Sequence, residues 1–137
     1  MVPNPKDIIL TKEEVEEVLE KIKICIENNR IQYDPNKLEN FDFMSEYKLF
    51  RDDVIRIISK LTYKNFSRCT ISYNPKYLGE HLYIFGIKEC LKEAFSNKIN
   101  NVVIYIKFYL ISNNNGKDLT FVVSFHEAEY EIHYAFK

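Results

Sequence analysis

Four polar side chains that alternate along two apolar segments are the residues of this sequence best suited to acid–base and anion chemistry. Tyr105 and Lys107 are two positions apart in one segment, and Ser124 and His126 are two apart in the next. Residues two apart in an extended strand point to the same face of a sheet. An imidazole titrates near neutral pH, a phenol exchanges hydrogen bonds, and an ammonium attracts anions. The spacing therefore predicts one small patch suited to binding an anion and transferring protons.

The two segments that carry this patch are predicted to be strands, over 102–111 and 119–126. Every even position of the first segment is apolar, and so is every odd position of the second from 119 to 125. We therefore expect one face of each strand to belong to the core and the other to be mixed and more polar.

The linker at 113–116 reads Asn-Asn-Asn-Gly, and an Asn-Gly pair is the strongest short signal for a hairpin. A two-residue turn at this pair places Tyr105 directly opposite His126. A four-residue loop would instead pair Tyr105 with Ser124 and leave His126 diagonal to it, still within reach. Both registers gather the phenol, the imidazole and the nearby ammonium on one patch. An ordinary solvated sheet face is the alternative interpretation.

The first half of the chain has the period of helices. Thr11 and Glu14 form a capping-box signal ahead of an amphipathic run. The patterns predict helices over 12–28 and 36–46, a third that begins at Asp52-Asp53, and a further turn over 63–67. The helix over 36–46 is expected to bury Leu38, Phe41 and Met44.

After residue 68 the apolar period changes from that of a helix to that of a strand. The remaining predictions are strands over 69–73 and 81–87, and a short helix or an ordered loop over 88–98. Helices followed by strands indicate an α+β fold, with N-terminal helices packed on a C-terminal antiparallel sheet. We expect one domain over 1–137, helical over about 11–67 and sheet over about 69–137.

The composition narrows the class of protein. The formal net charge is -1, from 19 Lys and Arg against 20 Asp and Glu, so a strongly basic nucleic-acid binder is not indicated. The three cysteines form no CxxC motif, and the three histidines lack the spacing of a metal site. Neither a signal peptide nor a membrane span is predicted. We therefore expect a cytoplasmic protein without a metal or other cofactor.

Three short segments between residues 53 and 126 resemble a known family. They read Leu-Thr-Tyr-Lys-Asn-Phe-Ser-Arg at 61–68, Val-Ile-Tyr-Ile-Lys at 103–107 and Val-Val-Ser-Phe-His at 122–126. In order and spacing they are similar to segments of the MqsR-type mRNA interferase toxins, which belong to bacterial toxin–antitoxin systems and have a RelE-like fold. The resemblance implies a metal-independent endoribonuclease that cleaves single-stranded mRNA and is neutralised by a cognate antitoxin protein.

The resemblance also assigns roles to individual residues. It implies catalytic roles for Arg68, Glu80, Tyr105 and His126. In a ribonuclease of this kind, Lys107 and Tyr83 are the candidates for binding the RNA strand and stacking a base. Arg68 and His126 stand where the family has lysines, and Glu80 stands where it has a glutamine. In the implied reaction the RNA 2′-OH attacks the neighbouring phosphate, with His126 as base or acid and Arg68 on the phosphate. The alternative is a non-enzymatic protein-interaction module, for example of a mobile element, which accounts better for the near-zero net charge.

Overall fold

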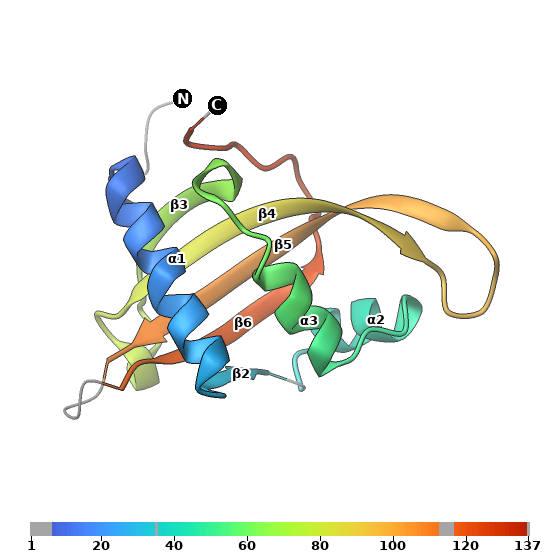
Figure 1. The fold of residues 1–137 in the computed structure, drawn as a ribbon, viewed down its shortest axis with the longest axis horizontal. Coiled ribbons are helices and arrows are strands. Elements are labelled where there is room, and N and C mark those ends of the chain that lie inside the picture. The colour runs from blue at the N-terminus through green and yellow to red at the C-terminus, as the bar shows by residue number, and fades with distance from the viewer. Residues whose placement is uncertain (1–6, 35, 113–116, 137) are drawn as a thin grey trace.

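Three helices and one six-stranded sheet make up the described part of this chain (Figure 1). The structure is a computed structural model that describes residues 7–34, 36–112 and 117–136. The α+β class is as predicted. In chain order the elements are β1 (Asp7–Ile8), α1 (Lys12–Glu27), β2 (Ile31–Tyr33), α2 (Leu38–Glu46), α3 (Arg51–Ile58), β3 (Phe66–Ile71), β4 (His81–Lys92), β5 (Ile99–Ile111) and β6 (Leu119–Glu127), with 3-10 turns at Tyr63–Asn65 and Pro75–Tyr77.

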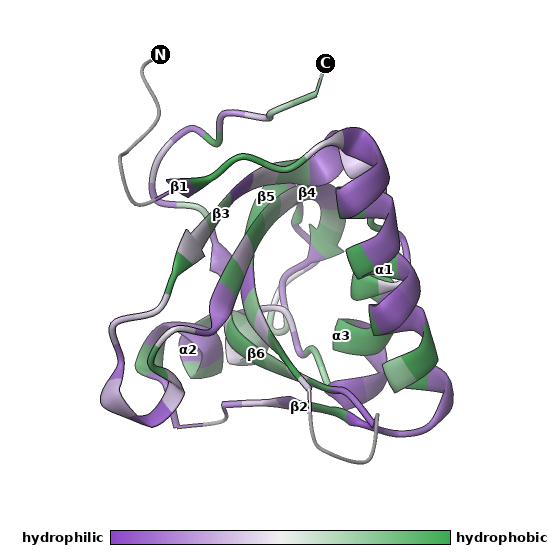
Figure 2. Cartoon of the chain, turned by 90° about the vertical axis from the view of Figure 1, so that its left-hand side faces the viewer, coloured by the Kyte–Doolittle hydropathy of each residue, from purple (hydrophilic) through white to green (hydrophobic). Residues whose placement is uncertain are grey.

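The sheet has the strand order β1-β3-β4-β5-β6-β2. Every neighbouring pair of strands is antiparallel except β6 and β2, which are parallel. The sheet is therefore mixed, and the prediction of a purely antiparallel sheet is wrong at this edge. The two- and three-residue strands β1 and β2 are too short to produce a periodic signal. In Figure 2, α1 and α3 lie to one side of the strands and α2 to the other.

Helix α1 begins at the predicted capping box. The Glu14 amide donates to the Thr11 hydroxyl at 3.1 Å, and the Thr11 amide donates to the Glu14 carboxylate at 2.9 Å. Its buried residues are Val15, Val18, Ile22 and Cys25, a helical spacing that turns one stripe onto the sheet. This stripe, together with the inner side of α3, forms the core on one face of β3–β6.

Helix α2 begins two residues later than predicted and buries a different side. Leu38 and Phe41 are 67% and 60% exposed, so their predicted burial is wrong. Met44 is partly buried and packs against the core. Asn40 and Phe43, three residues apart, are the buried positions. Because this short helix packs mainly against β6, one narrow stripe of it is covered.

Strand β4 continues through the segment predicted to be a helix or loop. Residues 88–92 pair with residues 99–103 of β5, so the prediction for 88–98 is wrong over its first five positions. The charged residues of this stretch interrupt the apolar pattern by which a strand is recognised in a sequence. Glu89 is one of them, and it pairs with Lys60 at 2.9 Å outside the core.

The register of β5 and β6 brings together the residues predicted to pair. Tyr105 lies directly opposite His126, and Lys107 lies opposite Ser124, which confirms the register of the two-residue turn at these positions. The linker itself, 113–116, lies outside the described residues.

A β-bulge divides β6 into two halves. Phe108 pairs with Val122 rather than with Val123, so Val123 is one residue too many on its strand. Nearer the linker, Thr120 and Val122 therefore face the core, and the prediction that 119, 121 and 123 do so is wrong. Beyond the bulge, Phe125 returns to the core as predicted.

Candidate functional site

The face of the sheet opposite α1 and α3 carries a row of side chains drawn from four strands. The cross-strand neighbours in this row are Arg68 of β3, Ile84 of β4, Lys107 of β5 and Ser124 of β6. The adjacent row consists of Gly86, Tyr105 and His126. Since directly paired residues share a face, these two rows form the floor of one surface.

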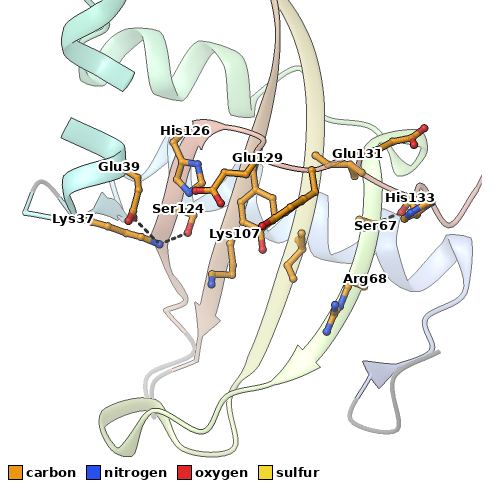
Figure 3. A pocket seen from close by; sticks show the side chains of 14 residues that line it. Lys37, Glu39, Ser67, Arg68, Lys107, Ser124, His126, Glu129, Glu131 and His133 are labelled. Atoms are coloured by element: carbon orange, nitrogen blue, oxygen red, sulfur yellow. Dashed lines mark hydrogen bonds and ion pairs between the residues drawn. The ribbon is translucent and has the colours of Figure 1, made fainter. Parts of the chain in front are cut away.

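This floor belongs to a cleft with a volume of about 510 Å³ (Figure 3). One wall is formed by Lys37 and Glu39, at the start of α2. The other wall is the segment that follows β6 and crosses the sheet. This wall contributes Glu129, Tyr130, Glu131, Ile132 and His133.

The rings of Tyr105 and His126 stack at one end of the floor. Their centroids are 5.5 Å apart and their planes are inclined by 24°. The His126 Nδ1 atom lies 2.9 Å from the backbone carbonyl oxygen of Glu127. Because a carbonyl oxygen only accepts, Nδ1 must be the protonated nitrogen of this hydrogen bond. The Nε2 atom is therefore the one available to accept or release a proton.

Three cations line the cleft: Arg68 and Lys107 in the central row of the floor, and Lys37 in one wall. The Lys37 ammonium donates to the Ser124 hydroxyl at 2.6 Å, and Arg68 pairs with Asp7 of β1 at 3.0 Å. Burial lowers the pKa of Lys107, and the positive charges of Lys37 and Arg68 lower it further. Mutual repulsion of this kind favours the binding of an anion among the three groups.

Tyr105 is held in its neutral form. Burial raises the pKa of its phenol, and the nearby Arg68 opposes this shift only in part. A neutral phenol donates a hydrogen bond and is a poor base. Tyr105 is therefore suited to binding an oxygen atom of an anionic ligand.

The wall formed by residues 128–136 is fixed at both ends. At one end the Ala128 amide donates to the Val103 carbonyl at 2.8 Å. At the other, the Ser67 hydroxyl donates to the His133 carbonyl at 2.8 Å, and the Ala135 amide donates to the Phe66 carbonyl at 3.0 Å. Between these anchors Ile132 lies on Gly86, where a Cβ atom would come within 2.4 Å of its Cδ1.

Four of the six residues assigned from the sequence lie in this cleft, and two do not. Arg68, Tyr105, Lys107 and His126 line it. Tyr83 is buried in the core on the opposite face, where its ring stacks on Phe108 at 5.7 Å, so it is not placed to bind RNA. Glu80 does not line the cleft either. Its charge contributes instead to the raised pKa of Tyr83, behind burial and Cys69.

Sequence reasoning missed both walls. Lys37 and Glu39 fall at the start of a predicted helix, but nothing in the pattern places that helix end beside the hairpin face, and residues 129–133 have no helical or strand period. The one available signal is Gly86, since a glycine inside a strand often marks the close approach of another segment.

Comparisons with protein-family models, curated proteins and solved structures found no match for this chain. No helix among the described residues is long and apolar enough to cross a membrane. Over the same residues, no group of three or more His, Cys, Asp or Glu side chains is placed to hold a metal ion. The functional interpretation therefore depends on the geometry of the cleft.

Proposed function

We propose that this chain is an endoribonuclease that cleaves single-stranded mRNA in the cytoplasm, as the toxin of a bacterial toxin–antitoxin pair with a RelE-like fold. One observation carries the proposal. A stacked tyrosine–histidine pair lies beside two cations, Arg68 and Lys107, on the floor of one cleft. These are the group types that phosphodiester transfer requires: proton-transfer groups and positive charge beside the developing negative charge.

The floor residues divide naturally between phosphate binding and proton transfer. Arg68 presents a planar fork of donors that matches a phosphate, and Lys107 adds a point charge two strands away. The neutral Tyr105 donates to a non-bridging oxygen. The Nε2 atom of His126 exchanges a proton with the reacting groups. Attack by the 2′-OH would leave a cyclic phosphate and a free 5′-OH.

The charges that line the cleft are separated between its floor and its walls. The cations Arg68 and Lys107 stand on the floor, whereas the carboxylates Glu39, Glu129 and Glu131 stand on the walls. An RNA strand responds to the local potential of the floor more than to the sum of charges, so the near-zero net charge of the chain is compatible with this role. In this proposal a separately encoded antitoxin neutralises the protein by covering the cleft.

Induced expression in a bacterial host tests the proposal. Wild type should stop growth and fragment mRNA, and His126→Ala should do neither. The matched control is His81→Ala, which removes an exposed histidine outside the cleft and should remain toxic. Absence of any effect of wild type on growth and mRNA, or full toxicity of His126→Ala, would refute the proposal.

A protein-interaction module is the second candidate, and the exposed side chains of Leu38 and Phe41 favour it. Salt dependence separates the two functions. Affinity for an RNA strand should fall steeply between about 50 and 200 mM salt, because phosphate binding releases counterions. Affinity for a protein partner through apolar side chains need not fall in this way.

A further inference from the structure

The floor of the cleft provides only one group suited to rapid proton exchange. Cleavage by a 2′-OH needs two proton transfers: a base takes the proton of the attacking hydroxyl, and an acid protonates the leaving 5′-oxygen. Tyr105 is held neutral, while Arg68 and Lys107 serve as cations. His126 can perform one of the two transfers, so a second group is missing from the floor.

The segment after β6 supplies a carboxylate at the required place. Glu129 and His126 line the same cleft, and Figure 3 shows the carboxylate of Glu129 directed into it, toward His126 and Ser124. Figure 3 also shows Glu131, two residues on, directed away from that cluster. Among the described residues, Glu129 has no hydrogen-bond or ion-pair partner, so its oxygens are free to accept a proton.

The position of Glu129 is set by the fold. Ala128, its neighbour, is tied to β5 by the hydrogen bond to Val103, and Ile132 lies on Gly86. These two fixed points limit how far residues 129–131 can move from the floor. The titratable and charged groups that line the cleft with this carboxylate come from every side of it. They are Lys37 and Glu39 at the start of α2, Arg68 of β3, Tyr105 and Lys107 of β5, His126 of β6, and Glu131 and His133 of its own segment.

We propose that Glu129 is the general base of the reaction and that His126 is the general acid, an inference that rests on the proposed ribonuclease function. The contact of His126 with the Glu127 carbonyl supports this division. The Nδ1–H group donates to this carbonyl, so Nε2 is the nitrogen left to exchange a proton with the reacting groups. The ionised Glu129 carboxylate has acceptor oxygens and no donor, so it can take up the proton of the attacking hydroxyl.

The step balances within these two groups. The 2′-OH gives its proton to the Glu129 carboxylate as the bond from the 2′-oxygen to phosphorus forms. The bond from phosphorus to the 5′-oxygen breaks, and that oxygen takes the Nε2 proton of His126. The products are a 2′,3′-cyclic phosphate and a 5′-OH. Glu129 is left protonated and His126 neutral, and proton exchange with water restores both.

A pH–rate profile with matched glutamine variants tests the assignment. The full chain is assayed on a short single-stranded RNA oligonucleotide under single-turnover conditions. Glu129→Gln should lower the rate by about 10²–10⁴-fold and remove the acid limb of the bell-shaped profile. Glu131→Gln removes the same charge from the same segment and should keep both limbs and a rate within about threefold of wild type. Equal rates and profiles for the two variants would overturn the assignment.

A substrate with a sulfur in place of the 5′-oxygen separates the acid from the base. A thiolate leaves without protonation, so His126→Ala should regain most of its lost rate on this substrate. Glu129→Gln should keep its full defect, because the 2′-OH still needs a base. Recovery by Glu129→Gln as well would overturn the inference. Failure of wild type to cleave any RNA is a different result, which refutes the proposed function itself.

Discussion

A methyl group added at Gly86 is predicted to loosen the segment that forms one wall of the cleft. The Cβ atom of Gly86→Ala would come within 2.4 Å of Ile132 Cδ1, 3.0 Å of the Tyr134 hydroxyl and 3.3 Å of Ile132 Cγ2. The first contact is shorter than any real packing distance, so the side chain of Ile132 must move. Its Cδ1 can rotate away, but its Cγ2 sits on the β-branch and moves only if the stiff χ1 angle changes.

Two opposing effects set the size of the change. Overpacking of this kind costs about 1–3 kcal/mol. Replacing a glycine inside a strand by alanine returns about 0.5–1 kcal/mol, because the unfolded chain loses less freedom on folding. We therefore expect Gly86→Ala to lower the free energy of unfolding by roughly 0.5–2 kcal/mol. The sign of this change is informative. If no segment covered Gly86, the same substitution would raise the free energy of unfolding.

Urea unfolding and amide exchange measure this prediction. Exchange should accelerate at Ala128 and Ala135, whose amides anchor the segment to β5 and β3. The matched background is Ile132→Val, which removes Cδ1 alone. In that background Gly86→Ala should lose about half or more of its destabilising effect, as expected for residues in contact. Stabilisation by Gly86→Ala in the natural background, with unchanged exchange, would refute this account of the wall.

Three further predictions concern the core, the pH dependence and the cations. Asn40→Ala should lower the free energy of unfolding by about 2–4 kcal/mol in urea titrations, because it removes the side-chain partner of the buried Phe125 amide and of the part-buried Val123 carbonyl. A change under about 0.5 kcal/mol would contradict this. Burial raises the pKa of Cys69 from 9.0 to about 12, so the unfolded state releases this proton first and stability should fall as pH rises from about 9 toward 12. Between about pH 8 and pH 10.5 the free energy of unfolding should fall less for Cys69→Ala than for wild type. Equal falls in the two proteins would contradict this prediction. Lys107→Gln should weaken RNA binding and reduce the salt slope by about one, whereas Lys92→Gln, on an exposed part of β4, should change neither.

The pairing of Tyr105 with His126 could be predicted because strand alternation and a short turn leave few registers. The same counting fails nearer the linker, where the pairs shift by one at the Lys107/Phe108 step. A bulge of this kind has no signature in the residues around Val123. Its consequence is that Thr120 and Val122 face the core in place of their neighbours.

The wall after β6 could not be predicted, because its residues have no periodic pattern. Glu129 follows the last strand and is positioned by backbone hydrogen bonds and by Ile132, not by an element of its own. Tyr83 is a different case, since it alternates in β4 with Phe85 and Ile87, which are both core residues. Its assignment to RNA binding assumed an exposed tyrosine that could stack a base, whereas the period of its own strand indicates burial.

The most direct test of the central claim is cleavage of matched RNA and DNA oligonucleotides by the purified full chain. Wild type should cut the single-stranded RNA and leave a 2′,3′-cyclic phosphate, and it should not cut DNA of the same sequence, which lacks the attacking hydroxyl. His126→Ala should be slower by about 10²–10⁴-fold. Equal cutting of RNA and DNA, or no cutting of RNA by wild type, would contradict the account.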